Sequence, residues 1–583
     1  MSKLTKILPP LLIIIMVLIS FFSVRQDSAI MDEVAHIPAG YSYLKYQDYR
    51  LNPEHPPLAK MLAALPLLFL HLQFPLNHPS WTTDVNGQWE AGYQFLYHLG
   101  NDADKILLWS RLPIIALLIL LGIYVWKWAK ELLGAKWALA VLFLYTFSPT
   151  IIAHSHYVTT DLAATCFIFI AFYYFVHYLK KPSLKNTLLA GLALGLAEVA
   201  KFSAVLLFPC FVLLALVSLL LNRPPQTSWL KQTKNHIGKF ILICLIALGV
   251  ILIVYQPAVW AFNLEKQQEL IRGSIGPEKI ENIVLAISKI PGAQGLAQYI
   301  LGIVMVFARV GGGNTNYFLG QVSNQGWWYY FPTCFFLKET ISVLILTGLA
   351  LLFVIRKFAT NLVKDRSRKW LPWLREYALC HLAEISMVVF IIVYGVVSMK
   401  GKLNLGVRHI MVLFPFIYIL IIKEFKRRTA ETAYKKLFTG ILIVLLVWVG
   451  VEVTINYPSY LAYYSELTGG SKNGYKFITD SNLDWGQDLR RMAEWVNANP
   501  DIQKIKVDYF GGGVPSYYLG DKYQEWHSQN GPTTGWIAVS TNYFSESIYR
   551  KDSTLATSYY YLELRKPEKI FGHSIFVYYI PEK

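Results

Sequence analysis

Residues 8–24 read LPPLLIIIMVLISFFSV, and a polar stretch at residues 32–60, DEVAHIPAGYSYLKYQDYRLNPEHPPLAK, follows this apolar run almost directly. Similar apolar runs recur along the 583 residues, which are 54% hydrophobic and only 16% charged. Soluble domains carry about 25% charged residues. The sequence therefore predicts an all-α protein that crosses a membrane many times, not a large soluble domain.

Apolar runs of spanning or nearly spanning length number about eleven, given the roughly 20 residues that a bilayer requires. A shorter run at residues 299–310 carries Arg309 and is typical of an interfacial helix. The long runs lie at residues 8–24, 106–126, 137–153, 162–179, 188–200, 202–221, 240–255, 333–355, 380–398, 405–422 and 437–455.

Basic residues concentrate in every second segment between these runs. With the amino terminus in the cytoplasm, this set faces inward, and the positive-inside bias indicates that orientation in the plasma (cell inner) membrane. The net charge of +17 then serves topology, so we expect no nucleic-acid partner. The inward segments are residues 1–7, 127–136, 180–187, 222–239, 356–379 and 423–436.

Three outer segments are long: two loops and a tail that begins at residue 456. The tail contains strand-like runs and a helical pattern that Ser481 or Asn482 would cap. We expect residues 1–455 to form a membrane module and residues 456–583 a small extracytoplasmic α/β domain. The outer loops are residues 25–105 and 256–332, the strand-like runs 504–509, 536–540 and 575–580, and the helical pattern 483–496.

Asp32 and Glu33 are the first candidate catalytic residues. Transfer of a sugar to a hydroxyl needs a general base, and a carboxylate suits that role. Two acids just past a span could also be ordinary interfacial residues, but Arg50, His55 and Lys60 follow them closely and favour a functional cluster. The prolines between these residues fix a rigid shape, which would serve either a pocket or a plain connector with solvated charges.

His154, His156 and Asp161 lie at the outer junction of the third and fourth runs. Asp161 would begin a helix, where a carboxylate also caps free amides, so a structural role is the alternative. Two histidines at i and i+2 are weak evidence for a metal without further ligands. The five cysteines lie in or beside apolar runs and form no CxxC, so we expect no disulfide and no cysteine-ligated metal.

Further cations lie on the same side of the membrane. A leaving group that departs as a phosphate needs such charges. Lys201 could instead pair with Glu198 at i, i+3, and the others could be snorkelling anchors. The candidates for substrate or phosphate binding are Arg50, His55, Lys60, His154, His156, Lys201, Lys402, Arg408 and His409.

Together these motifs resemble the GT-C membrane glycosyltransferases, and in particular bacterial members of the protein O-mannosyltransferase and aminoarabinose-transferase group. The resemblance extends over nearly the whole chain. Its motifs are Asp32-Glu33, GYSYL at 40–44, YRLNPEHPPL at 49–58, the HxH turn to Asp161 at 154–161, YFLG at 317–320, GWWYYFP at 326–332, GVRH at 406–409 and DSNLDWGQD at 480–488.

The resemblance implies a polyprenyl-phosphate-sugar donor, an outer-face active site and inversion at the anomeric carbon. It implies Asp32 as the base, Glu33 as its neighbour, Asp161 as a second carboxylate, and Lys201 and Arg408 at the donor phosphate. It implies no obligatory metal or other cofactor. The implied partners are the lipid-linked sugar, membrane lipid and a hydroxyl acceptor on a protein, lipid or glycan.

Two other functions remain as alternatives. A transporter or flippase of lipid-linked sugars would explain the spans and the basic residues, but it should show internal repeats and charges deep in the spans. Most charges here gather at the outer ends, with Lys338 and Glu339 as the nearest exception. A non-enzymatic envelope scaffold would leave the polar stretch at residues 32–60 unexplained.

Overall fold

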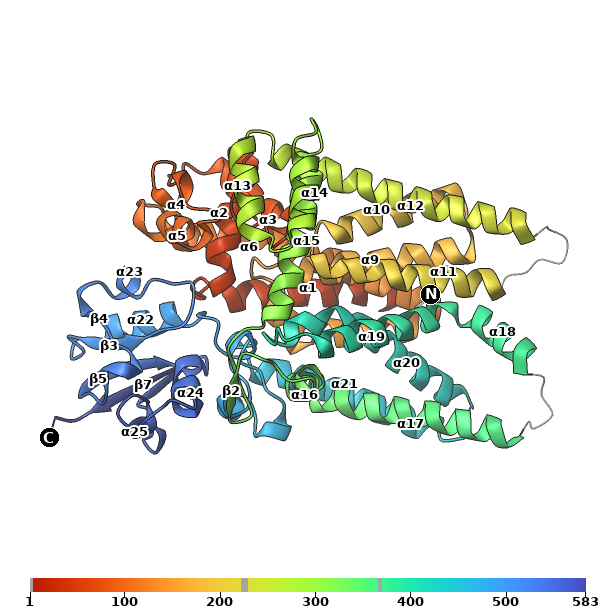
Figure 1. Cartoon of the computed structure of the whole chain (residues 1–583). Helices are drawn as coiled ribbons and strands as arrows, with labels where there is room; N and C mark the ends of the chain where they lie inside the picture. The colour runs from red at the N-terminus through yellow and green to blue at the C-terminus, as the bar shows by residue number, and fades with distance from the viewer. Residues whose placement is uncertain (1–3, 222–228, 365–369, 432, 583) are drawn as a thin grey trace.

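The computed structural model describes residues 4–221, 229–364, 370–431 and 433–582, and parts of the inward segments 222–239 and 356–379 lie outside these ranges. The protein is an α-helical, multi-pass membrane protein with a small sheet near its carboxyl end, as the sequence predicts. In Figure 1 the long helices run side by side, and the sheet lies beyond one end of the bundle.

Eight helices within the described ranges are long and apolar enough to span a bilayer, or nine if the bent pair α16 and α17 counts as one span. The expected count of about eleven is too high because several runs form short helices. Run 137–153 divides where Ser148 caps a new helix that begins with Pro149. Run 405–422 begins as the 3-10 helix η4 before α20.

The helices of the bundle are α1 (Leu4–Val24), α6 (Ala103–Leu133), α7 (Ala135–Thr146), α8 (Pro149–His154), α9 (Asp161–Lys180), α10 (Leu184–Glu198), η3 (Phe202–Leu206), α11 (Leu207–Leu221), α12 (Trp229–Ala258), α16 (Tyr330–Lys338), α17 (Ile341–Lys364), α18 (Trp370–Cys380), α19 (Leu382–Lys400), η4 (Val407–Leu413), α20 (Phe414–Glu431) and α21 (Lys435–Ile455).

The bend between α16 and α17 measures 117° and falls where Lys338 and Glu339 interrupt the apolar run. Both side chains are buried. Lys338 Nζ donates to the carbonyls of Leu461, Tyr463 and Asn482, and the hydroxyl of Tyr418 donates to Glu339. Lys338 therefore fixes the carboxyl-terminal region against the bundle, whereas Glu339 contacts α20 within the bundle.

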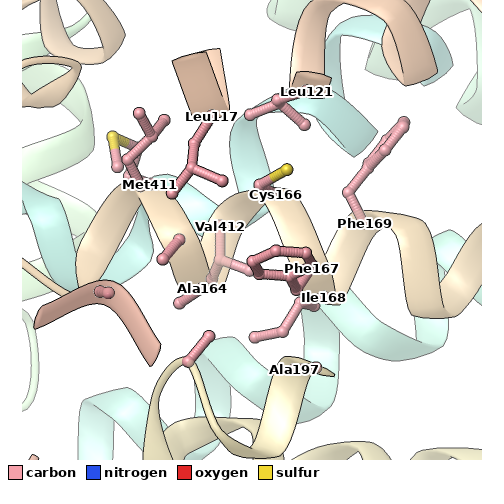
Figure 2. Packing of buried hydrophobic residues seen from close by; sticks show 14 of the residues in the cluster. Leu117, Leu121, Ala164, Cys166, Phe167, Ile168, Phe169, Ala197, Met411 and Val412 are labelled. Atoms are coloured by element: carbon pink, nitrogen blue, oxygen red, sulfur yellow. The ribbon is translucent and has the colours of Figure 1, made fainter. Parts of the chain in front are cut away.

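Helix α9 lies at the centre of the apolar core. Figure 2 shows its side chains, among them Phe167, packed with Leu117 of α6, Ala197 of α10 and Met411 and Val412 of η4. Burying such side chains contributes about 1.5–3 kcal/mol each where the alternative is water. This packing fixes two polar positions at once, because α9 begins at Asp161 and η4 carries Arg408.

The chain between α1 and α6 folds onto the bundle through short helices. Helix α2 carries the two adjacent acids, and α3 packs against it so closely that a side chain at Gly40 would overlap the carbonyl of Lys60. The elements are α2 (Met31–Lys45), α3 (Pro57–Ala64), η1 (Leu65–Phe69), α4 (Pro79–Thr82), α5 (Gln88–Tyr93) and η2 (Gln94–His98).

The chain between α12 and α16 contains three helices that lie across the long helices in Figure 1. The last of them, α15, is long and apolar enough to span a bilayer. Its crossing direction suits the predicted interfacial helix at residues 299–310, and that placement stays a prediction. The elements are α13 (Leu264–Ser274), α14 (Glu278–Ser288), α15 (Gln294–Gly312) and the antiparallel hairpin of β1 (Asn316–Phe318) and β2 (Gln321–Ser323).

The tail forms a five-stranded sheet in the order β4-β3-β5-β7-β6. Strand β3 is parallel to both β4 and β5, whereas β7 is antiparallel to β5 and β6. The three predicted strands are confirmed. The strands are β3 (Ile505–Asp508), β4 (Tyr523–Glu525), β5 (Gly535–Ser540), β6 (Lys569–Phe571) and β7 (Ile575–Ile580), and the α-helices are α22 (Leu489–Ala498), α23 (Pro515–Leu519), α24 (Thr541–Tyr549) and α25 (Tyr560–Glu563).

The predicted start of the tail helix is wrong. Helix α22 begins at Leu489, since Gly486 has a φ of +98° that interrupts any earlier helix. Ser481 and Asn482 therefore do not cap it and bind residues of the membrane module instead. The apolar core of the bundle includes Trp485, so the two predicted domains are in close contact; their boundary at residue 456 stays a prediction.

Candidate active site

Glu33 is completely enclosed by hydrogen-bond donors. It lies in the first turn of α2, where its Oε2 accepts from the backbone N–H of Ile30 at 3.1 Å. Its Oε1 accepts from the N–H of Val158 at 3.1 Å. Arg111 donates to both oxygens, at 2.8 and 2.6 Å. This paired geometry is the strong form of an arginine–carboxylate contact, and it uses the whole carboxylate.

Arg111 was not a candidate in the sequence, although it stands alone in the apolar run 106–126. Besides Glu33, it donates to the carbonyls of Asp27 and Ser28, each at 3.0 Å. The side chain is buried in α6 and fixes the chain entering α2. A charged residue within a span usually has such a specific partner, and this was the available signal.

Asp32 points elsewhere and keeps one side open. Its side chain is 21% exposed, and its Oδ2 accepts from Arg408 Nη1 at 2.9 Å. The neighbouring carboxylates therefore separate by role in the structure. Glu33 is buried in a closed ion pair, and Asp32 lies at the partly exposed edge of a cluster of charged residues.

Asp161 is the second carboxylate of this cluster. It begins α9, is buried, and accepts from Lys201 at Oδ1 and from Arg408 Nη1 at Oδ2, the latter at 3.2 Å. Lys201 thus pairs with Asp161 and not with Glu198, which accepts from the hydroxyl of Tyr299 at 2.9 Å. Asp161 is more than a helix cap, because it links two cations from distant segments.

Arg408 connects the cluster. Its Nη1 contacts both Asp32 and Asp161, and its Nε donates to the hydroxyl of Ser481 at 3.1 Å. The guanidinium lies over the ring of Trp485, 4.1 Å from the ring centre. The aromatic ring on one face and the hydrogen-bond acceptors at its nitrogens fix the direction of the guanidinium. A flexible lysine would not be fixed in this way.

Residues of the tail motif at 480–488 contact Arg408. Besides Ser481 and Trp485, Asp480 approaches this arginine. Burial raises the pKa of Asp480 to about 6, although the charge of Arg408 opposes the shift. Sequence reasoning found the motif but assigned it no chemistry, because its contact with Arg408 joins residues more than seventy positions apart.

Arg50 and Lys60 are placed outside this cluster. Arg50 forms a two-point ion pair with Asp48, at 3.0 and 2.6 Å, and lies over the ring of Trp81. Lys60 is buried, and its Nζ donates to carbonyls of the loop before it, including that of His55 at 2.7 Å. Both cations hold the proline-rich segment in shape.

The histidines lie near the cluster without joining it through a hydrogen bond among the described residues. His55 packs edge to face on His36, at 5.0 Å between ring centres. His154 is buried 6.0 Å from the ring of Trp485, and His156 is buried beside Tyr157. His409 follows Arg408 in η4. Lys402 is exposed and donates to Gln325 at 2.8 Å, away from the carboxylates.

The cluster therefore contains two carboxylates, Asp32 and Asp161, and two cations, Lys201 and Arg408. Such an arrangement can hold an anionic group at the cations while a carboxylate accepts a proton. Within the part of the chain that the structure describes, no three His, Cys, Asp or Glu side chains are grouped to hold a metal ion.

A comparison with protein families matches part of the chain. Residues 99–253 match the family model described as dolichyl-phosphate-mannose-protein mannosyltransferase. This match confirms the resemblance to GT-C glycosyltransferases. The matched segment includes Arg111, Asp161 and Lys201, whereas Asp32 and Arg408 lie outside it. None of the curated proteins matches the sequence.

Solved structures give weaker likenesses. The S. cerevisiae protein O-mannosyltransferase Pmt1-Pmt2 complex bound to the sugar donor is 19% identical with a TM-score of 0.31, and the match covers 48% of this chain and only 35% of that one. ArnT from Cupriavidus metallidurans bound to undecaprenyl phosphate is 12% identical with a TM-score of 0.42, over 99% and 98% of the two chains. The Archaeoglobus fulgidus oligosaccharyltransferase is 10% identical with a TM-score of 0.42, over 92% and 70%.

Proposed function

We propose that this protein is an inverting glycosyltransferase that moves a sugar from a polyprenyl-phosphate donor to a hydroxyl on the outer face of the membrane. The observation that carries the proposal is the cluster in which Arg408 joins Asp32 to Asp161 beside Lys201. The family description, which names a lipid-phosphate-linked mannose, supports the class of donor.

In this mechanism Asp32 accepts the proton of the acceptor hydroxyl, whose oxygen then attacks the anomeric carbon. The bond from that carbon to the phosphate oxygen breaks, and polyprenyl phosphate leaves with the electron pair. Lys201 and Arg408 stabilise the charge that develops on this phosphate. Attack from the face opposite the leaving group inverts the anomeric configuration.

Arg408 also regulates when the base is free. It contacts Asp32 in the structure, so Asp32 is partly neutralised before substrate binds. A phosphodiester carries a negative charge and competes with Asp32 for the guanidinium. Binding of the donor phosphate at Arg408 therefore frees Asp32 to accept a proton. Glu33 holds the start of α2 in place and does not accept the proton, since Arg111 and two backbone amides already donate to its carboxylate.

Sugar transfer in vitro tests this proposal. Purified protein receives radiolabelled polyprenyl-phosphate sugars and an envelope extract, and Asp32→Asn is measured beside the wild type. The matched control is Asp84→Asn, an exposed acid in the same outer loop. Label should reach an acceptor with the wild type and the control but not with Asp32→Asn. Wild-type turnover in Asp32→Asn would refute the role of Asp32, and donor movement across vesicles without transfer would favour a flippase.

The proposed orientation places the amino terminus in the cytoplasm of a plasma-membrane protein, with the active site and the tail outside. The basic inward segments support it. A reporter that is active only outside the cytoplasm, fused after the last residue, should be active, and the same reporter inserted in the inward segment 180–187 should be silent. The reverse pattern would contradict the orientation.

A further inference from the structure

The tail contains a polar cavity of about 500 Å³, whose lining residues are separate from the Asp32 cluster. It lies where the three parallel strands end: Asp508 closes β3, His527 follows β4, and α24 leaves directly from β5. Ligands of open α/β sheets bind at this carboxyl edge of the strands. The lining includes Asp508, His527, Tyr543, Glu546, Arg550 and Asp552.

Asp508 is fixed at the base of this cavity. It is buried, and its Oδ2 accepts from the hydroxyl of Tyr559 at 2.6 Å. Its Oδ1 lies 3.1 Å from Nδ1 of His527, whose ring is half exposed. Burial raises the pKa of Asp508. A buried carboxylate held by two side chains is a preorganised acceptor, and the other ring nitrogen of His527, Nε2, lies 3.2 Å from Glu525.

The charges of the cavity select against an anionic ligand. Three carboxylates line the cavity. Among its described lining residues there is one arginine, Arg550, and no lysine. Arg550 is already paired, at 3.1 Å with Asp552 and 3.9 Å with Glu546. The net charge is negative, so a phosphate group would be repelled. Hydroxyl groups, which donate to carboxylates, suit this lining, and Tyr543 adds a half-buried aromatic ring.

Helix α24 connects this cavity to the Asp32 cluster. Asn542 in its first turn accepts from the hydroxyl of Thr479 at 2.7 Å and from the N–H of Asp480 at 3.2 Å. Its own N–H donates to Asp484 at 3.1 Å. The next residues of the helix, Tyr543 and Glu546, line the cavity. The segment 479–484, which contacts Arg408, therefore also binds the first turn of α24, and α24 lines the cavity.

We propose that this cavity binds the saccharide portion of the acceptor, as a neutral or amino-bearing glycan, and so selects acceptors that already carry sugar. Its role in acceptor choice rests on the proposed glycosyl transfer, whereas saccharide binding itself does not. Binding here would hold the acceptor on a rigid part of the tail whose other end borders the catalytic cluster.

Saccharide binding by the full-length Asp32→Asn protein tests the proposal without any transfer. The probes are maltotriose, mannotriose and chitotriose at millimolar concentrations, observed by saturation-transfer NMR with a lipid-embedded sample. At least one trisaccharide should bind. Glu546→Gln should weaken its binding by about tenfold, since a charge-assisted hydrogen bond is lost. Glu563→Gln, an exposed acid on α25 outside the cavity, should leave binding unchanged.

The outcomes separate this inference from the proposed function. If none of the trisaccharides binds, or if Glu546→Gln and Tyr543→Ala bind as the parent does, the saccharide site is refuted even when sugar transfer is demonstrated. Cavity-dependent binding of a cationic, serine-rich peptide in place of the sugars would also overturn it and indicate a peptide acceptor. Trisaccharide binding with no transfer by the wild type would leave the site standing and refute the transferase.

Discussion

Asp32 and Glu33 are neighbours in sequence, yet they belong to two very different ion pairs. Glu33 is fully buried, and its two oxygens accept two arginine N–H groups and two backbone amides. Asp32 is partly exposed and shares one arginine nitrogen with Asp161. A carboxylate that is buried and has hydrogen-bond donors at both oxygens therefore serves the structure. An open carboxylate whose partner is itself shared is the one suited to chemistry.

Exchanging each acid for its amide breaks this comparison most directly. Asp32→Asn should lower the turnover of sugar transfer by about a thousandfold, the contribution of a general base, with an unchanged thermal unfolding midpoint. Glu33→Gln should leave Arg111 uncompensated in the interior and destabilise the fold by about 3 kcal/mol. The measurements are single-turnover transfer and thermal unfolding on the same preparations. An inactive Glu33→Gln protein of wild-type stability would reverse the two roles.

Substituting the shared arginine sharpens the comparison at the donor. Arg408→Lys keeps the charge but has one nitrogen for the three acceptors that Nη1 and Nε now reach. We expect the KM for the lipid-linked sugar to rise by roughly tenfold to a hundredfold, because the fork geometry that suits phosphate is lost.

Lys402→Ala is the contrasting variant for this measurement. Its Nζ reaches Gln325 on the exposed side, so the KM should change by less than about twofold. A wild-type KM in Arg408→Lys would mean that any positive charge at this position suffices, and that the contacts of Arg408 with the carboxylates are incidental.

The sequence predicts the membrane-spanning fold because apolar runs and loop charges are local signals. It overcounts the spans where the chain breaks, as at Ser148-Pro149 and at the bend after Lys338. Three of the cluster residues, Asp32, Asp161 and Arg408, are candidates from their motifs alone. Their mutual contacts could not be predicted, since Arg408 and Asp32 are 376 positions apart.

The partners of the buried charges were the harder part to predict. Lys60 and Arg50 look like site cations in sequence, but their bonds to nearby carbonyls and to Asp48 emerge only when the loop is folded. Arg111 was overlooked for the converse reason: an apolar run conceals a single charge until its partner, 78 positions away, is known. Tertiary pairing, and not residue type, decides which charges serve structure.

Asp480 provides the smallest effect and the finest comparison, because it has features of both carboxylates. It is buried like Glu33 and lies near Arg408 like Asp32, and burial raises its pKa to about 6 despite that arginine. Below pH 6 the carboxyl is neutral, so Arg408 is more available to a donor phosphodiester, whose own charge does not titrate in this range. Donor binding should therefore tighten by roughly fivefold, or about 1 kcal/mol, as the pH falls through 6.

Asp480→Asn isolates this effect, because the amide oxygen can still accept from the N–H of Ser481. The variant should bind donor with the low-pH affinity of the wild type at every pH from 5 to 8, measured by titration of the Asp32-containing protein with lipid-linked sugar. A pH dependence that persists in Asp480→Asn would assign the titration to another group. It would then follow that Arg408 is governed by Asp32 and Asp161 alone, and that the tail motif supports the site without tuning its charge.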